Sequence, residues 1–78
     1  MASTDRLKKR SFSIAGHRTS VALEPEFWTQ LDAEARAKRI ALAALVARVD
    51  AKRADRNLAS ALRVHVLVLA LEKPARGP

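Results

Sequence analysis

HRTSVALEP, residues 17–25, is the stretch that decides the fold. Positions 19, 21 and 23 are β-branched or apolar and the positions between them are polar or small, a period of two that is typical of a strand with one buried face. A single strand leaves a row of unpaired backbone N–H and C=O groups, so it needs a partner. We expect that partner to be the same strand of a second chain, in an antiparallel ribbon with Val21 and Leu23 facing the core.

A hairpin within one chain is the alternative. Residues 11–14 (SFSI) also alternate, and Ala15-Gly16 offers a turn. Tight hairpins favour Asn-Gly or Asp-Gly, however, and the apolar positions change from even before Gly16 to odd after it. We interpret this change as a bend and favour the ribbon between two chains.

The chain is short and contains no cysteine. With 78 residues it holds one small domain, and dimerisation is a natural way to complete so small a core. Neither disulfides nor thiolate zinc sites can form. No apolar run approaches the roughly 20 residues of a membrane helix, and residues 1–10 lack the core of a signal peptide. We therefore expect a cytoplasmic, nucleoid-associated protein with no membrane contact.

The net charge of +7 is unevenly distributed. Residues 1–23 carry five basic side chains against one acidic, residues 24–35 carry four acidic and no basic, and residues 36–56 carry seven basic against two acidic. We expect residues 1–10 to form a flexible basic arm whose Lys8, Lys9 and Arg10 contact phosphates. A basic arm that leads into an outward-facing strand favours double-stranded DNA as the partner over a merely soluble basic surface.

Two helices are predicted directly after the strand. Pro25 suits a first helical turn and the basic pair Lys38-Arg39 suits a helix end, which predicts a helix over about residues 25–38. A heptad seam with one flaw also allows a single long coiled-coil helix. Ile40 is apolar but lies off that seam, so we favour a break and a second helix over about residues 41–54.

A third helix is predicted over about residues 58–73, with Asn57 as its N-cap and a disordered tail over 74–78. Alternating valines between residues 64 and 68 also fit a buried strand, but the length and the cap favour a helix. Because this helix is apolar almost all round, we expect it to be buried in a subunit interface. The single domain thus covers residues 11–73, and its predicted dimer core consists of Val21, Leu23, Trp28, Leu31, Leu45, Leu62 and Val66.

The order of these elements resembles the ribbon-helix-helix (MetJ/Arc-type) DNA-binding family. Residues 15–28 (AGHRTSVALEPEFW), 42–46 (LAALV) and 57–64 (NLASALRV) are most similar to a bacterial subgroup of ribbon-helix-helix domain proteins, and the resemblance covers about residues 11–72. It implies a mainly α fold with one short strand, an intertwined homodimer that shares an antiparallel ribbon, and an additional C-terminal helix. It also implies a transcriptional regulator, a repressor, that inserts its ribbon into the major groove of DNA.

Carried over to this sequence, the resemblance assigns base reading to Arg18, Ser20 and Ala22. Arg18 is the strong reader, because arginine contacts guanine through O6 and N7. The phosphate-binding amides are those near Ala41 and Leu42, at the start of the second helix.

Catalysis finds no support in the sequence. Tyrosine is absent, His17 and His65 lie far apart, and no glycine-rich phosphate loop or metal-ligand spacing occurs, so we expect no enzyme activity, no cofactor and no metal. We expect His65 inside the protein or at an interface. His17 is a candidate phosphate contact, with a hydrogen-bonded residue at the start of the strand as the alternative.

The alternative function is a protein-interaction or dimerisation module, such as an antitoxin-type adaptor whose partner is a toxin and which has little DNA specificity of its own. Salt-dependent binding to a duplex separates the two classes. Whether dimers assemble further on tandem DNA sites is left open.

Overall fold

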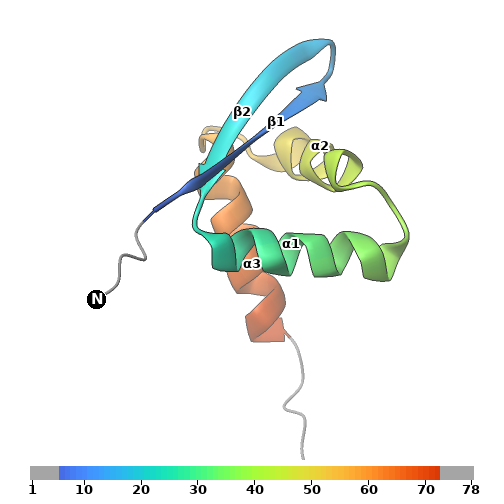
Figure 1. Cartoon of the computed structure of the whole chain (residues 1–78), viewed down its shortest axis with the longest axis vertical. Coiled ribbons are helices and arrows are strands. Elements are labelled where there is room, and N and C mark those ends of the chain that lie inside the picture. The colour runs from blue at the N-terminus through green and yellow to red at the C-terminus, as the bar shows by residue number, and fades with distance from the viewer. Residues whose placement is uncertain (1–5, 73–78) are drawn as a thin grey trace, which may run out of the picture.

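The computed structural model describes residues 6–72; residues 1–5 and 73–78 lie outside this range. Two strands and three helices follow one another as β1 (Lys8–Ile14), β2 (His17–Leu23), α1 (Pro25–Lys38), α2 (Leu42–Lys52) and α3 (Leu58–Glu72). Figure 1 shows the strands as a hairpin that lies across the helices, with its turn projecting beyond α2. The hairpin contacts α2 through β1 and α3 through β2, so the molecule has one sheet layer on one helical layer.

The partner of the predicted strand lies in the same chain, which overturns our preference for a bend at Gly16. β1 pairs antiparallel with β2, from Lys8 opposite Leu23 to Ile14 opposite His17. In a hairpin with a two-residue turn, each even-numbered residue of one strand pairs with an odd-numbered residue of the other, as Ile14 does with His17. The change of parity across the turn, which we interpreted as a bend, is therefore what places the apolar side chains of both strands on one face.

The hairpin turn consists of Ala15 and Gly16, whose φ angles are 51° and 82°. Two successive left-handed residues are typical of the type I′ turn, whose twist suits a two-residue hairpin. Glycine adopts this conformation freely, whereas an alanine there is strained. Burial of Phe12 and Ile14 against the helices offsets this strain, since both side chains are less than 9 % exposed.

Part of the predicted flexible arm belongs to this hairpin. Lys8, Lys9 and Arg10 are the first three residues of β1, which corrects the prediction for these positions. Because side chains alternate along a strand, Lys8 and Arg10 lie on the helix side of the hairpin and Lys9 lies on the outer side. Residues 1–5 of the predicted arm lie outside the described residues.

α1 ends at Lys38, where the sequence predicts its end. Arg39 is left-handed, with a φ of 58°, and its amide donates to the carbonyl of Arg36 (3.1 Å). The amide of Ile40 donates to the carbonyl of Ala35 (3.0 Å), which completes a left-handed helix cap. The chain therefore breaks near Ile40, and the single coiled-coil helix is wrong.

The other two helices differ from the prediction only at their ends. α2 stops at Lys52, two residues early, because Ala54 has a φ of 54° and cannot continue a right-handed helix. α3 begins where Asn57 caps it, with the Ser60 amide donating to Asn57 Oδ1 (2.8 Å). α3 is helical as far as Glu72, so the alternative of a buried valine strand is wrong. The predicted tail lies outside the described residues.

The core is one apolar cluster between the hairpin and the helices. Every residue predicted for the dimer core is at most 9 % exposed, but all of them are buried within one chain. Phe12 and Ile14 of β1 join them, as do several residues of α2 and α3. The C-terminal half of α3 is different: Leu67, Val68 and Leu71 are 53, 43 and 74 % exposed in the single chain.

Candidate nucleic-acid interface

The outer face of the hairpin carries small and basic side chains. The strand register places Lys9, Ser11 and Ser13 of β1 beside Ala22, Ser20 and Arg18 of β2, and all but the half-buried Ala22 are exposed. The Ser11 and Ser20 hydroxyls are 3.0 Å apart and share one hydrogen bond. With no large side chain at its centre, this face allows another surface to approach the sheet closely.

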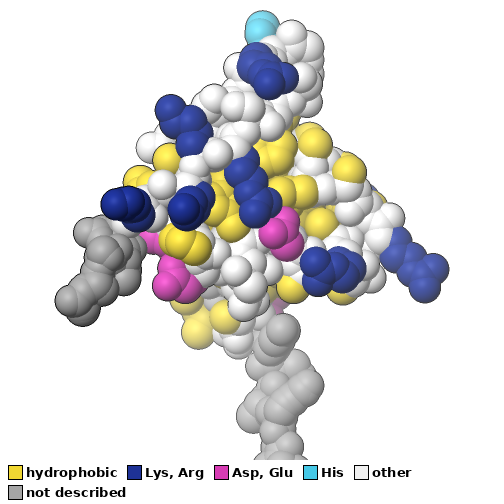
Figure 2. All heavy atoms as spheres, in the orientation of Figure 1, with side chains coloured by type: hydrophobic (Ala, Val, Ile, Leu, Met, Phe, Trp, Pro, Cys, Tyr) yellow, Lys and Arg dark blue, Asp and Glu magenta, His cyan; other side chains and the backbone are white. Residues whose placement is uncertain are grey.

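The predicted base readers thus lie together in a row on β2. Arg18 stands near the turn, Ser20 at the middle of the strand and Ala22 toward the helices. His17 is the first residue of β2 and is exposed beside the turn, opposite Ile14. Figure 2 shows Lys and Arg side chains along the hairpin and on the helices below it, with few acidic side chains between them on this face.

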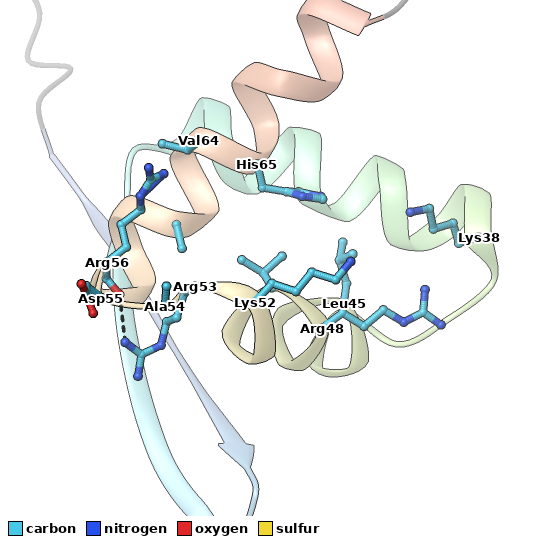
Figure 3. A pocket seen from close by; sticks show the side chains of 12 residues that line it. Lys38, Leu45, Arg48, Lys52, Arg53, Ala54, Asp55, Arg56, Val64 and His65 are labelled. Atoms are coloured by element: carbon cyan, nitrogen blue, oxygen red, sulfur yellow. Dashed lines mark hydrogen bonds between the residues drawn. The ribbon is translucent and has the colours of Figure 1, made fainter.

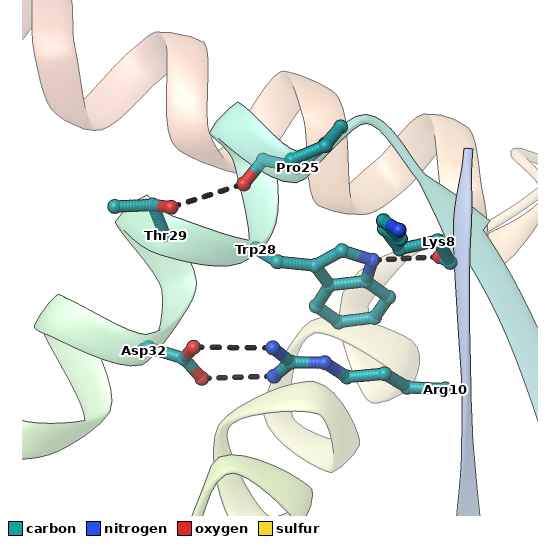
Figure 4. A network of polar contacts seen from close by, with 6 residues as sticks. All are labelled: Lys8, Arg10, Pro25, Trp28, Thr29 and Asp32. Carbon is teal, nitrogen blue, oxygen red and sulfur yellow. Dashed lines mark hydrogen bonds and ion pairs between the residues drawn. The ribbon is translucent and has the colours of Figure 1, made fainter. Parts of the chain in front are cut away.

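Arg10, a predicted phosphate contact, is instead held against α1. Its guanidinium donates to both carboxylate oxygens of Asp32 (3.0 and 3.3 Å) and lies over the Trp28 ring, with its central carbon 4.7 Å from the ring centroid (Figure 4). The Trp28 Nε1–H donates to the carbonyl of Lys8 (2.8 Å). These contacts hold the N-terminal part of β1 against α1 and engage the Arg10 guanidinium.

Three of the four carboxylates in the acidic segment 24–35 form ion pairs within the fold. Asp32 pairs with Arg10, and Glu24 accepts a hydrogen bond from Arg63 of α3 (3.0 Å). The hydrogen bond to its own backbone amide, followed by the one from Arg63, lowers the pKa of the exposed Glu24 carboxyl. The sequence shows this segment only as a reversal of charge, but in the structure its carboxylates join α1 to the hairpin and to α3.

Glu34 is the most enclosed of these carboxylates, with 9 % of its side chain exposed. It accepts hydrogen bonds from Lys38 Nζ on its own helix and from His65 Nε2 of α3, both at 2.7 Å. Burial raises the pKa of the Glu34 carboxyl, but the hydrogen bonds from Lys38 and His65 outweigh it, and the pKa is lower than its ordinary value. His65 is half-buried, in agreement with its predicted interior position.

The start of α2 has no polar cap. Ala41 is the N-cap, its side chain accepts no hydrogen bond, and the first turn contains no acidic residue. The amides of Ala44 and Leu45 donate to the Ala41 carbonyl (3.0 and 3.2 Å), which leaves the amides of Leu42 and Ala43 without an acceptor inside the helix. This is the position where the resemblance implies phosphate binding.

A comparison with protein families identifies the fold. The family model described as the ribbon-helix-helix domain matches residues 7–69, which is most of the chain. This chain belongs to the ribbon-helix-helix domain family. Ribbon-helix-helix proteins are typically DNA-binding regulators or antitoxins that bind DNA as dimers, and they are generally not enzymes. Comparisons with curated proteins and with solved structures found no match.

Within residues 6–72 of this ribbon-helix-helix chain, no group of three or more His, Asp or Glu side chains is placed to hold a metal ion. Over the same residues, no helix is both long and apolar enough to cross a membrane. The register also places Ser11 and Ser13 of β1, which were not predicted site residues, next to the predicted row on β2, together with the predicted phosphate contact Lys9. The signal for this face is the alternation of residues 11–14, which supports the hairpin within one chain.

Proposed function

We propose that this protein is a sequence-specific, double-stranded DNA-binding regulator, a repressor, that presents the outer face of its hairpin to the major groove as a homodimer. The observation that carries the proposal is the outward-facing row of the exposed Arg18 and Ser20 and the half-buried Ala22 on the strand that leads into α1, in a chain of the ribbon-helix-helix family. In the dimer proposed below, the two central strands, one β2 from each chain, form the two-stranded ribbon that suits the major groove, and the β1 strands flank it.

The dimer forms through the second edge of β2. In a two-residue hairpin the residues next to the turn, Ile14 and His17, form a hydrogen-bonded pair, so odd positions of β2 direct their backbone groups toward β1. The N–H and C=O groups of Arg18, Ser20 and Ala22 consequently point away from β1. A second copy of β2, antiparallel across a two-fold axis near Ser20, satisfies these groups and places two sets of readers side by side.

The exposed apolar half of α3 supports self-association of the same chain. Leu67, Val68 and Leu71 form an apolar surface that a small protein does not leave in water without reason. The predicted subunit interface at α3 therefore remains part of the proposal, now restricted to the C-terminal half of the helix.

Each part of the site contributes in a different way. Arg18 reads guanine, Ser20 contacts either kind of base group, and Ala22 touches a thymine methyl. Lys9 and the amides at the start of α2 contact phosphates, which fix the position of the protein without reading sequence. Arg10 is left out of this set because Asp32 and Trp28 engage its guanidinium.

A selection of bound fragments from the source genome tests the proposal, followed by fluorescence anisotropy on the enriched duplex. Arg18→Ala should lose about 1 to 3 kcal/mol of discrimination between the enriched and a scrambled duplex. Arg36→Ala, which removes an exposed arginine from α1, is the matched control and should keep this discrimination. No enrichment, or equal behaviour of the two variants, contradicts base reading by the hairpin and favours the antitoxin-type adaptor.

A further inference from the structure

A groove between α2 and α3 lies apart from the proposed DNA-reading face. Its volume is about 690 Å³, within the range of small-molecule sites. Leu45 and Val49 of α2 and Ala61 and Val64 of α3 form its apolar floor, and Arg53 to Arg56 of the connecting loop bound one end. Figure 3 shows the lining side chains of α2, α3 and the connecting loop around this space.

The rim of the groove is strongly cationic. Arg48, Lys52 and Arg56 line it and take part in no ion pair within residues 6–72. Two other polar residues of the lining, Lys38 and His65, already bind the Glu34 carboxylate. Asp55 is the one acidic residue of the lining, so basic side chains predominate around the groove.

The loop that bounds the groove is held in a fixed shape. The Arg53 guanidinium donates to the Asp50 carboxylate (2.6 Å) and to the Arg56 carbonyl (2.8 Å). Ala54 has a φ of 54°, a left-handed conformation that an alanine adopts only when its surroundings hold it there. Arg53 is thus committed to shaping the loop, while the side chain of Arg56 is available to a ligand.

We propose that this groove binds a small organic carboxylate with an apolar body. The apolar floor requires a ligand with a hydrophobic part, and the cations Arg48, Lys52 and Arg56 require a negative one. A phosphate backbone makes no use of the floor. None of its lining residues belongs to the proposed DNA contacts on the hairpin and at the start of α2.

The dimensions of the groove favour a small molecule over a docked helix. α3 lines it only from Ala61 to His65, which is roughly 6 Å at 1.5 Å per residue. A helix docked in a groove uses anchors over about seven residues, roughly 10 Å, a length that the α2 wall from Leu45 to Lys52 provides but the α3 wall does not. A second copy is disfavoured as the occupant by charge, because the acidic segment 24–35 is largely neutralised by its own ion pairs.

Titration of the ¹⁵N-labelled full chain with octanoate tests the proposal by NMR. We expect saturable shifts at the amides around Leu45, Val49 and Val64. Acetate, which has the charge without the apolar chain, and 1-octanol, which has the chain without the charge, should each bind at least about tenfold more weakly. Equal binding of octanol, equal shifts with acetate or inorganic phosphate, or shifts confined to Leu67, Val68 and Leu71 would overturn the proposal. So would an octanoate-dependent change in oligomeric mass, because it indicates a second copy as the occupant.

Two exposed rim variants and one matched control complete the test. Arg48→Gln and Arg56→Gln should each weaken octanoate binding by about tenfold, as expected for a lost charge-assisted contact. Arg36→Gln removes an exposed arginine that does not line the groove and should leave the affinity unchanged. Circular dichroism checks that each variant is folded. If the control weakens binding as much as the rim variants do, octanoate responds to net charge and the groove is not a site.

Discussion

Replacing Arg10 with alanine separates a structural role for this residue from a role in DNA binding. The change removes a bidentate ion pair with Asp32, in which the Arg10 and Asp32 side chains are 41 and 36 % exposed. It also removes the cation–π contact between the Arg10 guanidinium and the Trp28 ring, whose centroid lies 4.7 Å from the guanidinium carbon. An ion pair exposed to this degree contributes at most about 1 kcal/mol, and a cation over an aromatic ring adds about 0.5 to 1 kcal/mol. We expect Arg10→Ala to lower the free energy of unfolding by about 0.5 to 2 kcal/mol.

Urea denaturation followed by circular dichroism measures this loss. Asp32→Ala should account for the ion-pair part, so a double-mutant cycle between Arg10 and Asp32 should give a coupling energy of no more than about 1 kcal/mol. The remainder belongs to the contact with Trp28. Lys9→Ala is the matched control, because it removes a neighbouring cation from the outer face and should change the stability by less than about 0.5 kcal/mol.

Arg10→Ala and Lys9→Ala should have the reverse order of effects on DNA binding, where Lys9→Ala has the larger effect. Each phosphate contact that is lost lowers the slope of log affinity against log salt by about one unit per chain. Lys9→Ala should reduce this slope, and Arg10→Ala should leave it unchanged at a temperature where the variant is folded. If Arg10→Ala is as stable as the wild type and reduces the slope as much as Lys9→Ala does, the contacts of Arg10 with α1 are incidental and residues 8–10 act as the phosphate-binding arm first predicted.

Three further perturbations test the fold. Leu62→Ala should cost about 2 to 5 kcal/mol in urea denaturation, because Leu62 is fully buried at the centre of α3; a loss below about 0.5 kcal/mol would mean that α3 packs on another face. Ala15→Asn should raise the stability by about 0.5 to 1 kcal/mol, since asparagine tolerates the left-handed φ of 51°, and any destabilisation would contradict a type I′ turn. The Glu34 carboxyl has a lowered pKa, so its ionised form stabilises the fold above its ordinary pKa of 4.5, and this contribution is lost as the pH falls through the lowered value. The stability difference between the wild type and Glu34→Gln should therefore shrink on acidification, and a difference that is constant from pH 7 to pH 3 would contradict the ion pairs with Lys38 and His65.

The helices are predictable because their ends carry local signals. Pro25, the pair Lys38-Arg39 and the Asn57 cap each act within one turn of the chain, so the sequence alone locates the starts of α1 and α3 and the break between α1 and α2. The early end of α2 carries no such signal. It depends on the left-handed Ala54 and on the way Arg53 ties the loop to Asp50, and both are features of the folded loop.

The hairpin is the element that local turn preference predicts wrongly. Ala15-Gly16 is a poor type I′ turn by residue preference, whereas the apolar pattern of both strands favours their pairing. Tertiary burial of Phe12 and Ile14 decides the matter in the folded chain, and side-chain contacts across such distances cannot be read from local propensity. The role of Arg10 was missed for the same reason, since its partners Trp28 and Asp32 lie about twenty residues away in the sequence.

The ion pairs explain how a chain of net charge +7 separates its structural cations from its available ones. The carboxylates of Glu24, Asp32 and Glu34, three of the four in segment 24–35, engage cations that include those joining α1 to the hairpin and to α3. Among the basic side chains that form no ion pair within residues 6–72, Lys9 and Arg18 lie on the outer face of the hairpin and Arg48, Lys52 and Arg56 line the groove between α2 and α3, while Arg36 and Arg39 at the end of α1 belong to neither surface. Two of these groups of cations thus lie on separate surfaces, one flat with small hydroxyl side chains and one hollow with an apolar floor. A flat basic face suits a nucleic acid and a hollow one suits a small amphipathic anion, so the two proposals follow from one distribution of charge and are tested by different ligands.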